Sequence, residues 1–150
     1  MAMSERKRPL AIKILIIIKV FIAISGIATG LMLFSDPSGK SMGLDILLDK
    51  IPFQSFILLG LWFVGPYGLL PATLAYGLYR GNLWVWRPSL LLAVVEVIWI
   101  LVQIPMFGIG VLHFIFGSIG LVSIYFLYRP SVMEYLNNST RGSMQNTAQS

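Results

Sequence analysis

The sequence predicts an all-α fold, an integral membrane four-helix bundle with a short amphipathic interfacial helix between the first and second spans. Of its 150 residues, 57% are hydrophobic and only 11% are charged, whereas a soluble domain carries about 25% charged residues. The mean hydropathy is +0.81, and the apolar residues gather into long runs between short polar segments. A soluble chain of this composition would expose an aggregating surface, so lipid is the expected solvent.

These runs predict three parts: a basic cytoplasmic head over residues 1–9, one transmembrane domain over 10–130 and a polar cytoplasmic tail over 131–150. The tail is rich in Ser, Asn and Gln, and we expect disorder beyond Leu136. The expected spans cover residues of about 10–34, 53–79, 89–106 and 109–128.

The first span is an apolar run whose only charges past Leu10 are Lys13 and Lys19. At about 1.5 Å per residue, the stretch 14–34 is roughly 30 Å long, which matches one hydrocarbon core.

The loop that follows begins with a turn and continues with a helical pattern. Asp36-Pro37-Ser38-Gly39 has the residue preferences of a type I turn. Further on, an apolar face follows the helical spacing i, i+3, i+4 and i+7, with Asp45 and Asp49 opposite it; its members are Leu44, Leu47, Leu48 and Ile51. We expect a short amphipathic helix lying flat on the membrane surface, the alternative being a polar loop that contains leucines. The acids Asp36, Asp45 and Asp49 would then lie outside the membrane, where solvated carboxylates are commoner than cation sites.

The second span is longer than an untilted helix needs and holds the helix breakers Gly65, Pro66, Gly68 and Pro71. Each proline removes one backbone hydrogen bond and crowds the carbonyl one turn earlier. We therefore expect a kink here, tolerated where neighbouring groups satisfy the freed carbonyls.

The last two spans follow a short turn at 80–82. Trp84 and Trp86, with Tyr79 nearby, indicate an interfacial aromatic belt. The third span then ends in a tight uncharged reversal at 105–110, and the fourth closes before Arg129-Pro130.

The basic residues predict the orientation. Two of them, Lys40 and Lys50, flank the spans on one side, and eight flank them on the other: Arg6, Lys7, Arg8, Lys13, Arg80, Arg87, Arg129 and Arg141. Because cytoplasmic flanks carry the excess of Lys and Arg, both termini should be cytoplasmic in the cell membrane.

Four polar groups lie inside the predicted spans: Lys19, Glu96, Gln103 and His113. Intramembrane ionisable residues are functional candidates by default, because each costs about 2.5–3.5 kcal/mol to insert. Lys19 and Glu96 lie at similar depth, so an ion pair is one interpretation if spans one and three are neighbours. The other is that Lys19 reaches the headgroups and Glu96 is protonated or hydrogen-bonded within the bundle.

The remaining polar groups predict either a pathway or a packing device. Glu96 and Gln103 share a helix face, and Gln103 and His113 lie equally far from the 105–110 reversal. His113, Gly117 and Gly120 mark a small-residue face that would let helices approach closely. A polar track through these groups is the functional hypothesis, and interhelical hydrogen bonding is the structural one that we favour.

Several chemistries find no support in the sequence. It has no cysteine and one histidine, so we expect no metal site, no catalytic constellation and no cofactor. The basic residues flank apolar runs and form no basic face, which argues against nucleic acid as a partner. The expected partners are the lipid bilayer and other membrane subunits or further copies of the chain.

The order of Asp36-Pro37-Ser38-Gly39, Pro52-Phe53 and Trp99-Ile100-x-x-Gln103 between four spans resembles a group of small uncharacterised prokaryotic membrane proteins. The ending Leu127-Tyr128-Arg129-Pro130 is similar too, and the likeness covers roughly residues 10–135. The resemblance implies the four-span fold and brings no established activity. Because the sequence shows no catalytic chemistry, its soluble parts are short and its helices are rich in Gly and aromatic residues, we expect an accessory or structural subunit that packs against a larger membrane complex. The alternative is a small oligomeric transporter or channel that uses Glu96, and an enzyme is the less favoured class.

Overall fold

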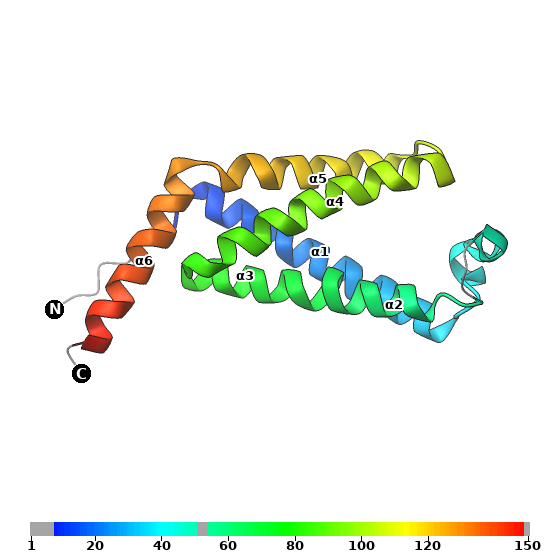
Figure 1. Cartoon of the computed structure of the whole chain (residues 1–150), viewed down its shortest axis with the longest axis horizontal. Coiled ribbons are helices and arrows are strands. Elements are labelled where there is room, and N and C mark those ends of the chain that lie inside the picture. The colour runs from blue at the N-terminus through cyan, green and yellow to red at the C-terminus, as the bar shows by residue number, and fades with distance from the viewer. Residues whose placement is uncertain (1–7, 51–53, 149–150) are drawn as a thin grey trace. The chain divides into compact units, whose positions relative to one another are not determined.

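The structure is a computed structural model that describes residues 8–50 and 54–148, and every regular element in these ranges is helical (Figure 1). The predicted all-α fold is confirmed. The elements in chain order are α1 (Leu10–Ser35), η1 (Lys40–Met42), η2 (Asp45–Lys50), α2 (Ile57–Val64), η3 (Gly65–Leu69), α3 (Leu70–Arg80), η4 (Leu83–Val85), α4 (Trp86–Phe107), α5 (Val111–Leu127) and α6 (Pro130–Ala148).

Three helical stretches are long and apolar enough to cross a membrane: Leu10–Ser35, Ile57–Arg80 and Leu83–Pro105. Helix α5 passes the same test only together with the following stretch Pro130–Gly142, from which it is bent by 62°. Length and composition therefore give the described chain three membrane-spanning helices, or four if the bent pair counts as one span.

The contacts divide the chain into two compact units. The large unit comprises Met1–Ile18 and Leu74–Ser150, and the small unit comprises Lys19–Thr73.

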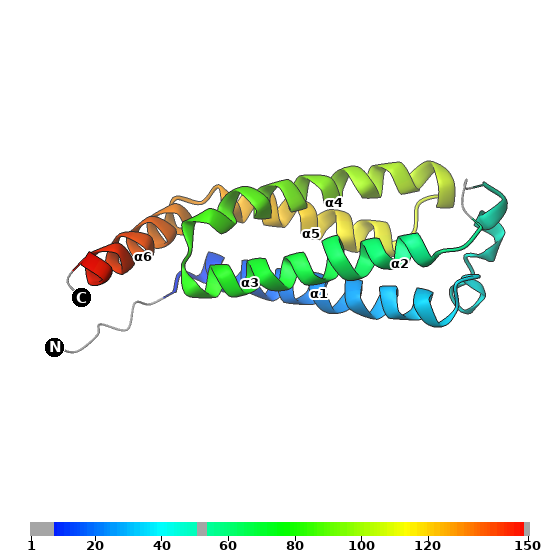
Figure 2. The same ribbon diagram turned by 60° about the horizontal axis from the view of Figure 1, so that its bottom comes forward.

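In the small unit, the second half of α1 lies against α2 and η3 with their backbones in close approach (Figure 2). A Cβ atom on Gly30 would lie 2.8 Å from the carbonyl oxygen of Gly60. One on Gly26 would lie 2.9 Å from the carbonyl oxygen of Phe63 and still closer to that of Tyr67. Only hydrogen fits at these two positions, so the glycines set the spacing of the helices.

The loop after α1 is anchored by the carboxylate of Asp36. It accepts hydrogen bonds from the Ser38 hydroxyl at 2.6 Å and from the Ser41 backbone N–H at 2.8 Å. These two bonds, in that order, lower the pKa of Asp36 to about 2. The predicted turn is confirmed by the hydrogen bond from Gly39 N–H to the Asp36 carbonyl, 3.0 Å long. Asp36 is therefore a structural anchor of the loop.

The predicted amphipathic segment is helical, but it is the 3₁₀-helix η2 and not an α-helix. Leu47 is buried in a cluster with Leu33 and Phe56, and Leu44 and Leu48 pack against that cluster. The leucine face therefore packs on this cluster of the protein, and the position of the helix on the membrane surface stays a prediction. Ile51 and the side chain of Asp49 lie outside the described residues. The tighter helix fits because the loop is tied at both ends, since the Phe56 N–H also donates to the Pro37 carbonyl at 2.9 Å.

Where the sequence predicted a kink in the second span, the structure has a π-helical turn, η3, between α2 and α3, within one continuous helical stretch. The Leu70 N–H donates to the carbonyl of Gly65, five residues back. In a π-turn each N–H bonds to the carbonyl five residues back instead of four. This change of partner lets the helix pass Pro66 and Pro71, which have no backbone N–H, and continue to Arg80.

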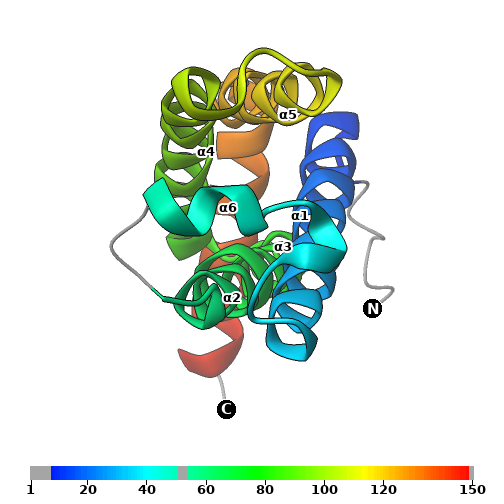
Figure 3. The same cartoon turned by 90° about the vertical axis from the view of Figure 1, so that its right-hand side faces the viewer.

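In the large unit, α4 and α5 lie side by side and antiparallel (Figures 1 and 3). Helix α4 runs two residues past the expected reversal at Pro105, because the Gly108 N–H still reaches the Ile104 carbonyl at 2.8 Å. At the other end of the pair, the indole N–H of Trp86 donates to the carbonyl of Leu127 at 2.9 Å. This bond satisfies one of the carbonyls that a helix C-terminus leaves open.

The expectation of disorder beyond Leu136 is wrong, because α6 continues as a helix to Ala148. Val132 and Leu136, one turn apart, are fully buried in the core of the large unit. Thr140 continues this stripe and accepts the Leu83 backbone N–H at 3.3 Å. The tail is polar in composition, but it contains a narrow apolar stripe that packs into the core of the large unit.

We predict that Gly26→Ala lowers the melting temperature in detergent. Alanine favours a helix over glycine by about 1 kcal/mol, but the added methyl would collide with two backbone carbonyl oxygens that cannot rotate away. Gly117→Ala is the matched control, because its Cβ would meet only a side chain at 3.7 Å. Thermal unfolding followed by circular dichroism checks this; equal or higher melting temperatures for both variants would contradict it.

Candidate functional site

The candidate site is a buried polar seam between α4 and α5. Along α4, the residues Ser89, Ala93, Glu96 and Ile100 follow helical spacing and are all buried. Ser89 and Glu96 are 0% exposed, so a carboxyl and a hydroxyl group lie inside the large unit. Glu96, seven residues from each end of the stretch 89–103, occupies the middle of α4.

Helix α5 presents its small residues to this face of α4. A Cβ on Gly120 would lie 2.8 Å from Cγ2 of Val97, 3.3 Å from the Ala93 carbonyl and 3.6 Å from Cγ of Glu96. One on Gly117 would meet Ile100 Cγ2 at 3.7 Å. The predicted close approach is therefore confirmed at Gly120, the position that lies over Glu96, whereas a methyl group at Gly117 would make only an ordinary van der Waals contact.

One turn beyond Gly120, the seam contains a second serine. Ser123 is fully buried, and its hydroxyl, like that of Ser89, has no hydrogen-bond partner among the described residues. A buried hydroxyl without a partner costs about 1–3 kcal/mol. These two serines are therefore unusual components of an apolar interface. The sequence interpretation missed both, although Ser89 stands seven residues before Glu96, on the face that holds Gln103.

Gln103 and His113 lie at the far end of the seam and are half-buried. Gly117 of α5 lies beside Ile100 of α4. One helical turn further along this antiparallel pair, His113 and Gln103 therefore lie at the same height on the two helices. The imidazole of His113 has a local role, since its Nδ1 accepts the Gly110 backbone N–H at 3.1 Å. The His113 N–H in turn donates to the Gly110 carbonyl at 3.0 Å, which closes a cap on the first turn of α5.

Lys19 belongs to the small unit, whereas Glu96, Gln103 and His113 belong to the large one. Its side chain is 0% exposed, and the ammonium nitrogen itself is buried. Both interpretations of Lys19, the extension to the headgroups and the ion pair with Glu96, stay predictions.

The acids of the loop do not gather into a site. Asp36 is committed to its own turn. In the part of the chain that the structure describes, no group of three or more His, Asp or Glu side chains could hold a metal ion.

Comparison of the chain with protein families, with curated proteins and with solved structures gave no match. The class that the fold defines is an all-α protein with helices fit to cross a membrane, and the seam of α4 and α5 is the feature that a function must explain.

We predict that Glu96→Gln lowers the melting temperature in detergent by the equivalent of about 1 kcal/mol, the range of polar contacts between membrane helices. A fully buried carboxyl group is stable only where its oxygens are satisfied, and an amide replaces one acceptor by a donor. Gln103→Leu should have a smaller effect, because Gln103 is half-buried.

Glu134→Gln, the same change on the exposed face of α6, is the control and should leave stability unchanged. If Glu96→Gln and Gln103→Leu both have the melting temperature of the wild type, the polar groups of the seam do not hold the helices together.

Proposed function

We propose that this chain is a structural or accessory subunit of a larger complex in a prokaryotic cell membrane. The observation that supports this role is the burial of polar side chains that lie within the helices. Lys19, Ser89, Glu96 and Ser123 are all 0% exposed, so these span residues are used within the fold. A subunit that only packs needs such an interior and no polar opening.

The outer face of α5 agrees with this role. Beyond its contact with α4, the helix exposes large apolar side chains, among them Val111 (74%), Phe114 (68%) and Leu121 (60%). Such a surface is stable against lipid or against the apolar face of another membrane helix. We propose that α5 is the side of the large unit on which a partner packs.

A small oligomeric transporter or channel is the second proposal, and two observations favour it. Glu96 is a carboxyl group buried within a helix long enough to cross the membrane, and such groups mark ion and proton pathways. The π-turn η3 interrupts another such helix, and π-turns recur at functional sites. In this role Glu96 would carry the proton or cation, and the second span would bend at η3.

We predict that purification from the native membrane in mild detergent yields this chain with other subunits in a fixed ratio. Phe114→Ala should weaken that association and preserve the helical content, because the side chain makes little contact within the large unit. Ile17→Ala, an equally exposed apolar position on α1 at 67%, is the control. Gel filtration and mass spectrometry of the purified species measure the ratio.

The opposite outcome has its own signature. A homo-oligomer without other subunits, whose proton or cation flux in liposomes disappears in Glu96→Gln and persists in Glu134→Gln, would overturn the accessory role and establish the transporter.

We also propose that both termini are cytoplasmic, on the basis of the basic residues. Because the chain has no cysteine, single cysteines report on topology directly. Ser41→Cys, in the exposed part of the loop, should react with a membrane-impermeant maleimide added to intact cells. Asn137→Cys, on the exposed face of α6, should react only after lysis. The reverse pattern would place the termini outside.

A further inference from the structure

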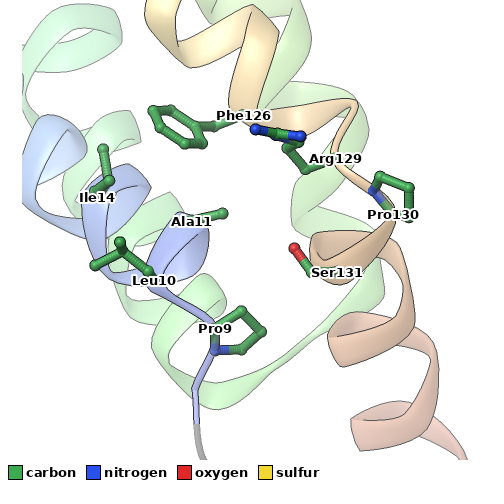
Figure 4. Close-up of a pocket in the computed structure, with 8 residues that line it drawn as sticks. All are labelled: Pro9, Leu10, Ala11, Ile14, Phe126, Arg129, Pro130 and Ser131. Atoms are coloured by element: carbon green, nitrogen blue, oxygen red, sulfur yellow. The ribbon is translucent and has the colours of Figure 1, made fainter.

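A cavity of about 550 Å³ lies between the start of α1 and the bend from α5 to α6, all within the large unit (Figure 4). Leu10, Ala11 and Ile14 line it from α1, and Phe126 lines it from the last turn of α5. Arg129 and Ser131 line it from the bend itself. Its volume is in the range of sites that hold small molecules, about 300–1,000 Å³.

The cavity lies at the ends of the apolar helices. Helix α1 begins at Leu10 and α5 ends at Leu127, so the opening is level with the point where the apolar sequence stops. In a bilayer this is the boundary between hydrocarbon and headgroups. An occupant here would contact apolar walls with one part and water with the other.

The lining is apolar except at the bend. Leu10 and Ile14 form an apolar wall on the α1 side, while Phe126, the guanidinium of Arg129 beside it and the hydroxyl of Ser131 lie on the other side (Figure 4). Arg129 is the one charged residue in this lining, and no carboxylate accompanies it. An anion at this position therefore meets a positive charge without a competitor within the lining.

The position of Arg129 is fixed by the fold. Its guanidinium lies over the ring of Tyr125, 4.8 Å from the centroid. The backbone N–H of Arg129 donates to the Phe126 carbonyl at 3.1 Å, and the Arg129 carbonyl accepts the Val132 N–H at 3.0 Å. The nearby cation Arg8 has its own partners, since it lies 4.0 Å above the Tyr79 ring, and hydrogen bonds to Tyr135 and then Tyr79 raise its pKa. Arg129 is thus the cation that faces the cavity.

We infer that this cavity binds one anionic glycerophospholipid. An acyl chain would lie along Leu10, Ile14 and Phe126, and the phosphate would accept hydrogen bonds from Arg129 and Ser131. Arginine suits this role because its planar guanidinium can bond two phosphate oxygens at once. The site goes beyond the subunit role and requires only that the chain resides in a membrane, so either can fail without the other.

Native mass spectrometry of the purified full chain tests the inference, with phosphatidylglycerol and phosphatidylcholine of identical acyl chains as probes. The wild type should retain phosphatidylglycerol in preference to phosphatidylcholine. Arg129→Gln should reduce that preference about five-fold, the effect of removing one basic residue that contacts an anionic headgroup. Arg129→Lys should keep most of it.

Arg87→Gln is the matched control, because it removes an exposed cation that does not line the cavity. Its preference should equal that of the wild type. Ala11→Leu fills the cavity from the α1 side and should reduce retention of both lipids without changing their ratio, and circular dichroism verifies that each variant is folded.

Three results would overturn the inference. The first is equal retention of the two lipids by the wild type, and the second is an equal loss of preference in Arg129→Gln and Arg87→Gln. The third is unchanged lipid retention in a folded Ala11→Leu protein.

Discussion

The close approach of helix backbones is the constraint on which the rest of this structure depends. In hydrocarbon, helices gain no hydrophobic free energy by pairing, so van der Waals packing and hydrogen bonds must hold them together. Glycine makes the packing possible in both units, through Gly26 and Gly30 in the small one and Gly120 in the large one. At Gly120 the approach also has a chemical consequence, because it lays the backbone of α5 over Glu96 and removes that side chain from lipid.

The second requirement is that backbone carbonyls find hydrogen-bond donors, and the chain meets it in different ways at Pro66 and Pro105. At η3, the π-turn moves the acceptor of the Leu70 N–H to Gly65, so the helix passes Pro66 without ending. At Pro105, the helix continues for two residues, and Gly108 then leaves it with a positive φ of 74°. The π-turn keeps the helical stretch Ile57–Arg80 continuous, whereas Gly108 ends α4 directly after Phe107. Both follow from the cost of an unsatisfied carbonyl in hydrocarbon.

The features that the sequence predicted well are those set by local chemistry. The apolar run of α1, the turn anchored by Asp36 and the small face of α5 depend on residues within one or two turns of each other. The features it missed depend on distant partners. Helix α6 is ordered because Val132 and Leu136 enter a core assembled from α1, α3 and α4, and composition alone cannot supply those partners. The cavity is likewise invisible in the sequence, since its walls come from two segments more than a hundred residues apart.

Helix α5 links the two features of the large unit that invite a function. Its middle packs Gly120 over Glu96, its last carbonyls include the one that accepts the Trp86 indole, and its end leads through Arg129 into the cavity. A shift of α5 along its axis would have to change all three together, because Gly120 packs tightly on Val97 and Ala93 beside Glu96 and the indole bond fixes the helix end. A lipid bound at Arg129 would therefore oppose such a shift, and α5 is the element through which headgroup binding would stabilise the buried carboxyl seam.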